Sequence, residues 1–178
     1  MASRRSSHER AQAMVQPRHL HHRAVVSAIR RAQPHDIPAM AALARAAYAP
    51  YAALLGFEPP AMAPDFGSGV AAEWVWLAVG AQGRPSGYVI AYPEGGAWHV
   101  ENLAVAPECQ GEGLGRALLA EAEAAGRAAG YARATLYTNR VMAGPLALYP
   151  RLGYLRTHEQ VRHCAAGRLE LVYFAKDL

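Results

Sequence analysis

The chain has very little lysine, cysteine or uninterrupted apolar sequence, and each shortage excludes a class of protein. Its single lysine is Lys176, near the C-terminus. A P-loop nucleotidase needs a lysine directly after the last glycine of its loop, and a pyridoxal enzyme needs a buried lysine, so both classes are disfavoured. Two isolated cysteines, Cys109 and Cys164, make neither a disulfide framework nor a zinc motif. No apolar stretch approaches membrane-spanning length, so we expect a cytoplasmic protein without a membrane partner.

Excess charge is confined to the N-terminal segment. Residues 1–24 carry five arginines against one glutamate, which accounts for the whole net charge of +4 and leaves 13 basic and 13 acidic residues in the rest. This polar, arginine-rich segment is predicted to be a disordered basic tail before one globular domain at 25–178. The tail could attract nucleic acid, but the neutral body predicts no specific nucleic-acid partner. Its histidines lack neighbouring cysteine or carboxylate partners, so no metal site is assigned.

The most informative segment, residues 99–119, reads HVENLAVAPECQGEGLGRALL. It predicts a strand, a glycine-rich turn and a helix, with Gln110, Gly113 and Gly115 in the order Q-x-x-G-x-G. Glycines let backbone N–H groups crowd around an anion, and the N-terminus of the following helix adds partial positive charge. The dinucleotide-binding fingerprint fails, because arginine or leucine stands at its sixth position. The segment therefore predicts a pyrophosphate site of another kind, with an ordinary tight turn as the alternative.

This turn, after a strand ending in LAV, resembles the GNAT family, the GCN5-related N-acetyltransferases. Residues 26–48 look like the family's opening strand and first helix. Residues 135–154, TLYTNRVMAGPLALYPRLGY, look like its later strand, its T-N-x-x-M turn and the helix ending in L-Y-x-x-L-G-Y. The resemblance covers the chain from about residue 25 to the end.

Both the hairpin pattern and the resemblance predict an α+β fold. We expect a GNAT-like mixed, mostly antiparallel sheet of about six or seven strands, with one parallel join and helices on both faces. The strands are expected at about 25–30, 73–79, 87–92, 97–106, 133–138, 153–161 and 168–175, and the helices from 37, near 61–72, from 113 and at 143–152. The first helix is expected to open into a proline-rich loop near Tyr48.

The resemblance implies an N-acetyltransferase that moves an acetyl group from acetyl-CoA to a primary amine. The glycine turn would hold the pyrophosphate, and pantetheine would lie along the strand end, where a backbone N–H near Val105 would face the thioester oxygen. Arg116 could reach a phosphate or could be a solvated arginine. The predicted cofactor-binding residues are Leu103, Ala104, Val105, Gln110, Gly111, Glu112, Gly113, Leu114, Gly115, Arg116 and Asn139.

Direct transfer needs a base for the amine and an acid for the departing thiolate. Glu101 is the leading base, its pKa expected to be raised by burial, although it could be a half-exposed residue in a salt bridge. His99, on the same strand face, is the second candidate. Tyr149 matches the family's acid, or is a packed aromatic. Pro145 and Pro150 predict a short or bent helix around it.

The acceptor is defined least by the sequence. Tyr48, Tyr51 and Phe57, with Met62 and Trp74, predict an apolar acceptor pocket or part of the core. A small or amino-acid-like amine is preferred to a protein lysine, and a homodimer is the commonest assembly. A catalytically weak acyl-CoA sensor of the same fold is the alternative function.

Overall fold

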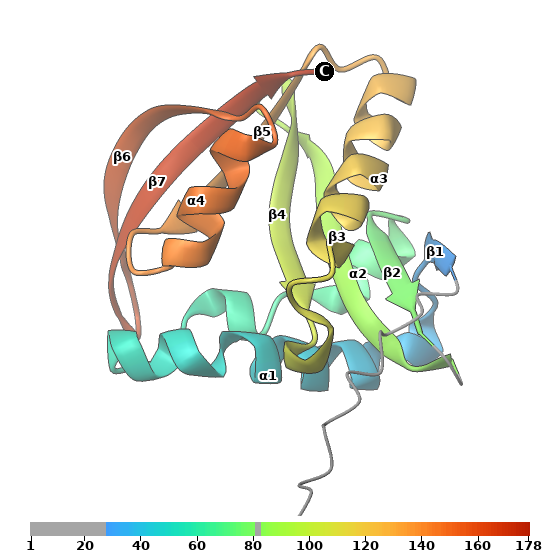
Figure 1. Ribbon diagram of the computed structural model, residues 1–178, viewed down its shortest axis with the longest axis horizontal. Helices are drawn as coiled ribbons and strands as arrows, with labels where there is room; N and C mark the ends of the chain where they lie inside the picture. The colour runs from blue at the N-terminus through green and yellow to red at the C-terminus, as the bar shows by residue number, and fades with distance from the viewer. Residues whose placement is uncertain (1–27, 81–82) are drawn as a thin grey trace, which may run out of the picture.

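The computed structural model describes residues 28–80 and 83–178. The predicted tail at 1–24 and the first residues of the predicted opening strand lie outside them. The strands are β1 Ala28–Arg31, β2 Val75–Val79, β3 Pro85–Glu94, β4 Ala97–Val105, β5 Arg133–Asn139, β6 Leu155–Cys164 and β7 Gly167–Asp177. They form one sheet in the order β1-β2-β3-β4-β5-β7-β6 (Figure 1). All neighbours are antiparallel except β4 and β5, which confirms the predicted mixed sheet with one parallel join.

Four α-helices pack on this sheet. They are α1 Ile37–Leu55, α2 Phe66–Ala71, α3 Leu114–Ala128 and α4 Ala143–Arg151. Gly87 of β3 faces α3, since an added Cβ would lie 2.9 Å from Leu118 Cδ1. The next residue, Tyr88, shares Asn102 with Tyr48 of α1. Neighbouring strand residues point to opposite faces, so α1 and α3 cover opposite faces and enclose the apolar core between them and the sheet (Figure 1).

The first helix is longer than its sequence predicts. It continues through Pro50 to Leu55 and ends at Gly56, whose φ of +77° forms a left-handed cap. An internal proline costs about 3 kcal/mol, but a buried face including Met40, Leu43 and Tyr48 packs on the sheet and outweighs that cost. The prediction that the first helix opens into a loop near Tyr48 is therefore wrong. Tyr48 and Tyr51 instead lie one turn apart on the same side of α1.

Strands β4 and β5 separate partway along their length, and this separation positions the site. Their pairing runs from Trp98–Ala134 to Val100–Leu136, whereas β4 continues to Val105 and β5 to Asn139. At the point of separation the β3–β4 register shifts, so that Ile90 pairs with Asn102 and Ala91 with Val100. Glu101 between them is the extra residue of a β-bulge. A bulge bends its strand and increases its twist, which turns β4 away from β5.

Candidate active site

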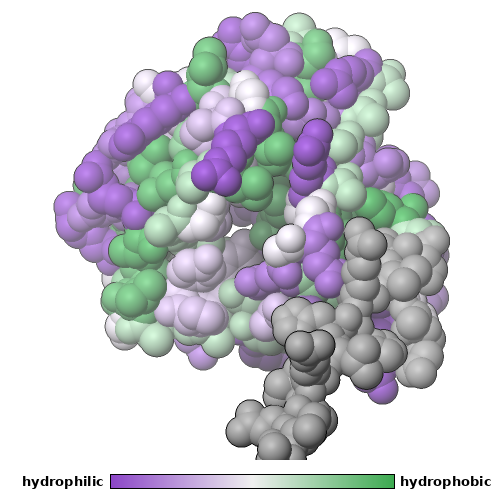
Figure 2. Space-filling view, viewed as in Figure 1, coloured by the Kyte–Doolittle hydropathy of each residue, from purple (hydrophilic) through white to green (hydrophobic). Residues whose placement is uncertain are grey.

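A cavity of about 140 Å³ lies where β4 and β5 separate. Helices α1 and α4 and the β6–β7 hairpin supply its other walls, and Figure 2 shows this side of the molecule hollowed near its centre. Both predicted catalytic residues, Glu101 and Tyr149, line it. The other lining residues are Tyr48, Tyr51, Leu55, Pro59, Pro60, Ala61, Val100, Asn102, Leu103, Tyr137, Thr138, Asn139, Met142, Pro145, Arg162, Cys164, Leu169 and Leu171.

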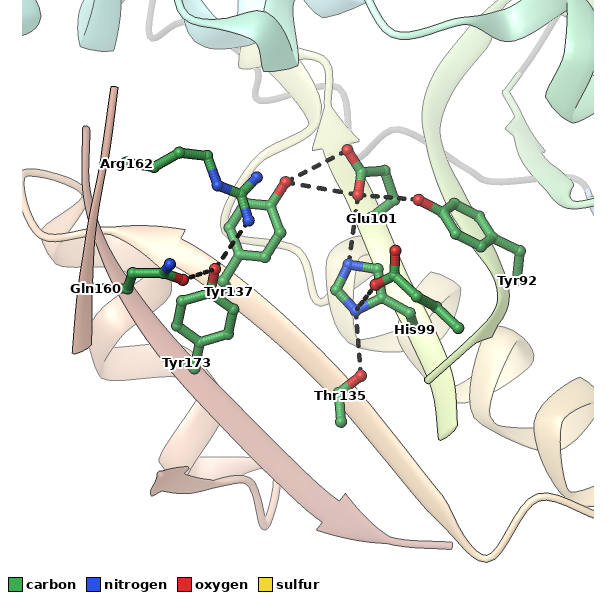
Figure 3. Close-up of polar contacts among 9 residues, drawn as sticks. Tyr92, His99, Glu101, Thr135, Tyr137, Gln160, Arg162 and Tyr173 are labelled. Carbon is green, nitrogen blue, oxygen red and sulfur yellow. Dashed lines mark hydrogen bonds and ion pairs between the residues drawn. The ribbon is translucent and has the colours of Figure 1, made fainter. Parts of the chain in front are cut away.

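Glu101 presents its carboxylate to three neighbours (Figure 3). Oε2 accepts a hydrogen bond from Tyr92 at 3.2 Å, and the Tyr137 hydroxyl lies 3.4 Å from Oε1. His99 Nε2 lies 3.3 Å from Oε2, within ion-pair distance. The Glu101 side chain is 35% exposed, so it can meet a ligand in the cavity while its neighbours hold its orientation.

The pKa of the Glu101 carboxyl shifts in the direction opposite to the one expected from the sequence. Burial alone would raise this pKa. The hydrogen bond and charge of His99 and the hydroxyls of Tyr92 and Tyr137 outweigh burial and lower it. Glu101 is therefore an ionised carboxylate at neutral pH, suited to attract an ammonium group.

His99 is buried between the cavity and the outside of the sheet. Its Nδ1 lies 3.1 Å from Thr135 Oγ1 and 3.8 Å from the carboxylate of Glu94, whose side chain is 60% exposed. His99 and Glu94 also line a second cavity, of about 260 Å³. The imidazole thus connects the Glu101 carboxylate on one side to an exposed carboxylate on the other.

Tyr149 lies inside α4 in spite of the proline that follows it. The helix is short, as its prolines predict; Pro145 stands in the first turn, where backbone N–H groups have no helical partner, and Pro150 precedes the end by one residue. The Tyr149 ring packs against Tyr154 and Phe174. Burial, with a smaller contribution from Tyr51, raises the pKa of Tyr149 to about 12, so its hydroxyl carries a proton at neutral pH.

The open edge of β4 presents backbone groups beyond the last β5 pairing. Ala106 donates its N–H to Ser86 on the β3 side, so the backbone groups of Val105 and Leu103 face away from β3, because successive strand residues alternate. Two of these backbone carbonyls accept hydrogen bonds from side chains: the Tyr48 hydroxyl donates to Leu103 and the Gln110 amide donates to Val105. The edge can therefore accept an extended ligand as an additional strand.

The glycine turn joins this edge to α3. Gly111 and Gly113 have φ of +82° and +83°, a backbone conformation that only glycine adopts without strain. Gly113 is also the N-cap of α3, with no side-chain capping bond, so the first N–H groups of this 15-residue helix point outward. Arg116 is exposed in the first turn, whereas Leu114 is buried in the core. Any contact of Leu114 with an anion would therefore be through its backbone.

The other predicted site residues are divided between the cavity and the surrounding structure. Asn139 lines the cavity, and its buried Nδ2 has no hydrogen-bond partner among the described residues. Tyr48 and Tyr51 line it too, although Tyr48 donates its hydroxyl to Asn102. Phe57 lies outside the lining and packs on Gly167, the first residue of β7, where an added Cβ would lie 2.5 Å from its ring.

Two further members of the predicted acceptor pocket also lie elsewhere. Met62 belongs to the core, and Trp74 packs on Tyr92 with ring centroids 5.2 Å apart. Sequence reasoning missed Tyr92, Tyr137 and Arg162. Their positions on three separate strands carry no local motif. Strand pairing alone brings Tyr92 and Tyr137 to Glu101 and places Arg162 in the lining of the same cavity.

The described residues, 28–80 and 83–178, contain neither a membrane-spanning helix nor a metal-binding cluster. No helix in these ranges is long and apolar enough to cross a membrane. In the same part of the chain, no cluster of three or more histidine, cysteine or acidic side chains could hold a metal ion.

Comparison with solved structures extends these observations. Nourseothricin acetyltransferase is 27% identical over 58% of this chain and 64% of its own, less than two thirds of its length, with a TM-score of 0.53. The ribosomal-protein-S18-alanine N-acetyltransferase of Escherichia coli is 23% identical over 84% and 92%, with a TM-score of 0.67. The PaiA N-acetyltransferase of Thermoplasma acidophilum, in complex with coenzyme A, is 16% identical over 85% and 98%, with a TM-score of 0.62. The two structures that are less than 25% identical to this chain show that it shares their fold.

A search of curated protein sequences gave no significant match. The model of the acetyltransferase (GNAT) domain matches residues 71–156, from before β2 to the start of β6. This range includes the open β4 edge, the glycine turn and α4. Residues 71–156 therefore match the acetyltransferase (GNAT) domain, and the described chain has the fold of solved GNAT N-acetyltransferases.

Proposed function

We propose that the protein transfers an acetyl group from acetyl-CoA to a small primary amine. One observation carries the proposal: Glu101 and Tyr149, to which the family resemblance gives opposite proton-transfer roles, line the same cavity beside the open β4 edge. A base and an acid in one enclosed space are what aminolysis of a thioester requires. The edge leads directly to a turn whose backbone suits a pyrophosphate.

The residues of the turn and edge fit acetyl-CoA at three points. The outward N–H groups at the start of α3, with Gly111 and Gly113, would hold the pyrophosphate. The backbone of Leu103 and Val105 would pair with pantetheine, and the unpartnered Asn139 Nδ2 would donate to it. When bound, acetyl-CoA supplies an activated acyl group and a thiol leaving group.

Glu101, with His99 beside it, would remove a proton from the acceptor ammonium. An alkyl ammonium has a pKa of about 10, so the amine arrives charged and is attracted to the ionised Glu101 carboxylate. Glu101 takes the proton, directly or through water, and His99 Nε2, 3.3 Å from Oε2, holds the carboxylate in position. His99 Nδ1 faces Thr135 and Glu94 on the side of the second cavity.

Tyr149 would donate the proton that the departing thiolate needs. Its raised pKa keeps the hydroxyl protonated throughout the working pH range. Its ring is fixed by Tyr154 and Phe174, so the hydroxyl has a defined position in the cavity.

Thermal unfolding with and without acetyl-CoA tests the proposal, with NAD and ATP as matched nucleotide controls. At a hundred times its Kd, a ligand stabilises the folded state by about 2.7 kcal/mol, or roughly 5–10 °C for a chain of this size. We expect a shift with acetyl-CoA alone, followed by release of free thiol when a primary amine is added. A shift without turnover on any amine would favour the acyl-CoA sensor. No shift for correctly folded protein would contradict the proposed donor site.

A further inference from the structure

Arg162 stands at the boundary between the two cavities. It lies on β6, and together with Tyr137 it lines both the cavity that contains Glu101 and the second cavity beside His99. Its guanidinium carbon lies 5.2 Å from the centroid of the Tyr137 ring, and Nη2 donates to the Tyr173 hydroxyl at 2.9 Å. The arginine is therefore held in place by two aromatic side chains (Figure 3).

Arg162 also has no counter-ion among the described residues, unlike the other arginines around this hairpin. Arg156 pairs with Glu159, Arg140 with Glu159 and Glu170, and Arg168 with Glu170. A guanidinium that is oriented by aromatic rings, lines a cavity and has no carboxylate partner among the described residues can bind an anion from solution.

The cavity thus has opposite charges on two sides of one tyrosine. The Tyr137 hydroxyl contacts the Glu101 carboxylate, and its ring contacts Arg162. A ligand with both an ammonium and a carboxylate would satisfy both groups. The remaining wall, between α1 and the hairpin, is apolar and includes Leu55, Pro59, Leu169 and Leu171.

We propose that the acceptor is a free amino acid with an apolar side chain, bound through its carboxylate by Arg162 and through its amine by Glu101. The inference rests on the proposed function and names its substrate class. Its side chain would pack on the apolar wall. An N-terminal or lysine amine of a protein has no free carboxylate beside it and would leave Arg162 unpaired.

The reaction balances without a further reactant. The ammonium loses one proton to Glu101, which later releases it to solvent. The resulting neutral amine forms a C–N bond to the acetyl carbon and loses its second proton to solvent as the C–S bond of the thioester breaks. The sulfur receives a proton from Tyr149, which is then reprotonated from solvent. The products are free coenzyme A and an N-acetyl amino acid.

Matched acceptors test the inference on the unmodified full chain. Phenylalanine, phenylalaninamide and 2-phenylethylamine share one side chain and differ in the group that Arg162 would bind. Leucine, leucinamide and isopentylamine form a second series. We expect kcat/KM to be highest for the free amino acid, by on the order of ten- to a hundredfold, because a charge-assisted bond to the carboxylate is lost in the other two.

Arginine variants provide the second measurement. Arg162→Gln should lower kcat/KM for phenylalanine on the order of ten- to a hundredfold, mainly through KM, and should lower kcat/KM for 2-phenylethylamine much less. Arg162→Lys should recover part of the loss, because it keeps the charge without the planar fork. Arg156→Gln, on the same strand but paired with Glu159, is the matched control and should leave kcat/KM unchanged for both acceptors.

Three results would overturn the inference. Equal use of the acid, amide and amine would show that the carboxylate is not recognised, and the proposed acetyltransferase activity would stand. Equal losses for both acceptors in Arg162→Gln would show a general structural role. Acetyl-CoA binding without acetylation of any amino acid would show that the acceptor class is wrong, whereas loss of acetyl-CoA binding itself would refute the proposed function.

Discussion

At the scale of single residues, the site depends on one inserted position in strand β4. The bulge at Glu101 leaves this residue without a partner on β3 and places its carboxylate among Tyr92, His99 and Tyr137. Those neighbours lower its pKa in spite of burial, so the carboxylate remains charged where an ammonium would enter. The same residue thus accounts for both the bend of the strand and the charge of the cavity.

Glu101→Gln should remove this charge while keeping the shape of the side chain. We expect kcat/KM to fall about 10²–10⁴-fold at pH 8, the usual range for loss of a general base, as measured by release of free thiol. Glu121→Gln, an exposed position on α3, is the control and should keep wild-type activity. Unchanged activity in Glu101→Gln would exclude this residue as the base.

The lowered pKa of Glu101 also predicts a pH dependence of stability. A carboxyl whose folded pKa lies below its unfolded value of about 4.3 stabilises the fold above that value, and this stability is lost as the pH falls through the folded pKa. The difference in unfolding temperature between wild type and Glu101→Gln should therefore shrink on acidification below about pH 4. A difference that grows in acid would mean that the pKa of Glu101 is raised.

Tyr149→Phe should separate acid catalysis from packing. The ring keeps its contacts with Tyr154 and Phe174, so the free energy of unfolding should change by less than about 1 kcal/mol. Loss of the proton donor should lower kcat about 10²-fold or more with little change in KM. Tyr154→Phe, in the same ring cluster, is the control in steady-state kinetics. Equal effects in the two variants would argue for a packing role.

At the scale of secondary-structure elements, the turn between β4 and α3 uses its glycines for two reasons. Gly113 needs a left-handed backbone, whereas Gly115 has ordinary angles and room for a Cβ, 3.6 Å from Val105 Cγ2. The glycine at 113 is required by the backbone conformation of the turn. The glycine at 115 leaves the space above the helix N-terminus free for a ligand.

Alanine at each glycine should therefore have different effects. Gly113→Ala should cost about 1–2 kcal/mol of stability in urea unfolding because its φ is positive. Gly115→Ala should unfold like the wild type yet bind acetyl-CoA about tenfold, or 1.4 kcal/mol, more weakly by calorimetry. Wild-type affinity in Gly115→Ala would contradict a close approach of the ligand to this backbone.

Helix α3 is tied to β7 by a buried ion pair. Lys176 Nζ lies 2.7 Å from Glu123 Oε2, and the Glu123 side chain is only 7% exposed. Lys176→Met should leave that carboxylate without its main partner and cost about 3 kcal/mol in urea unfolding. Arg127 also lies 3.6 Å from Glu123 but is 48% exposed, so Arg127→Met should cost less than about 1 kcal/mol. Equal costs would show that Lys176 is not the main counter-ion.

At the scale of the whole molecule, charge and chemistry occupy different parts of the chain. The net charge of +4 lies in residues 1–24, and the remainder is neutral. Deleting these residues should leave turnover and acetyl-CoA binding unchanged and abolish any salt-sensitive attraction to DNA in a gel-shift measurement. Lower turnover in the shortened chain would place the tail within the functional domain. The expected homodimer stays a prediction, which sedimentation of the full chain would test.

The features that depend on local order along the chain could be predicted from the amino-acid sequence. Alternating and helical periodicities predicted the sheet with its single parallel join, and the spacing Q-x-x-G-x-G predicted the turn that requires Gly113. The sequence also placed Glu101 and Tyr149 as the catalytic candidates. The sheet and the turn are confirmed, because backbone angles, strand alternation and helix caps depend on residues close together in sequence. The catalytic roles of Glu101 and Tyr149, which the resemblance implies, stay predictions.

The surroundings of those residues depend on the packing of segments that are far apart in the chain. Strand pairing brings Tyr92 and Tyr137 to Glu101, and with His99, the largest lowering cause, they reverse the expected shift of its pKa. Packing of α1 on the sheet overrides Pro50, and packing of Phe57 on Gly167 keeps that ring outside the cavity. Burial, charge and hydrogen bonding depend on which distant segments pack together. In this fold, the bulge in β4 and the β6–β7 hairpin determine which segments surround the cavity.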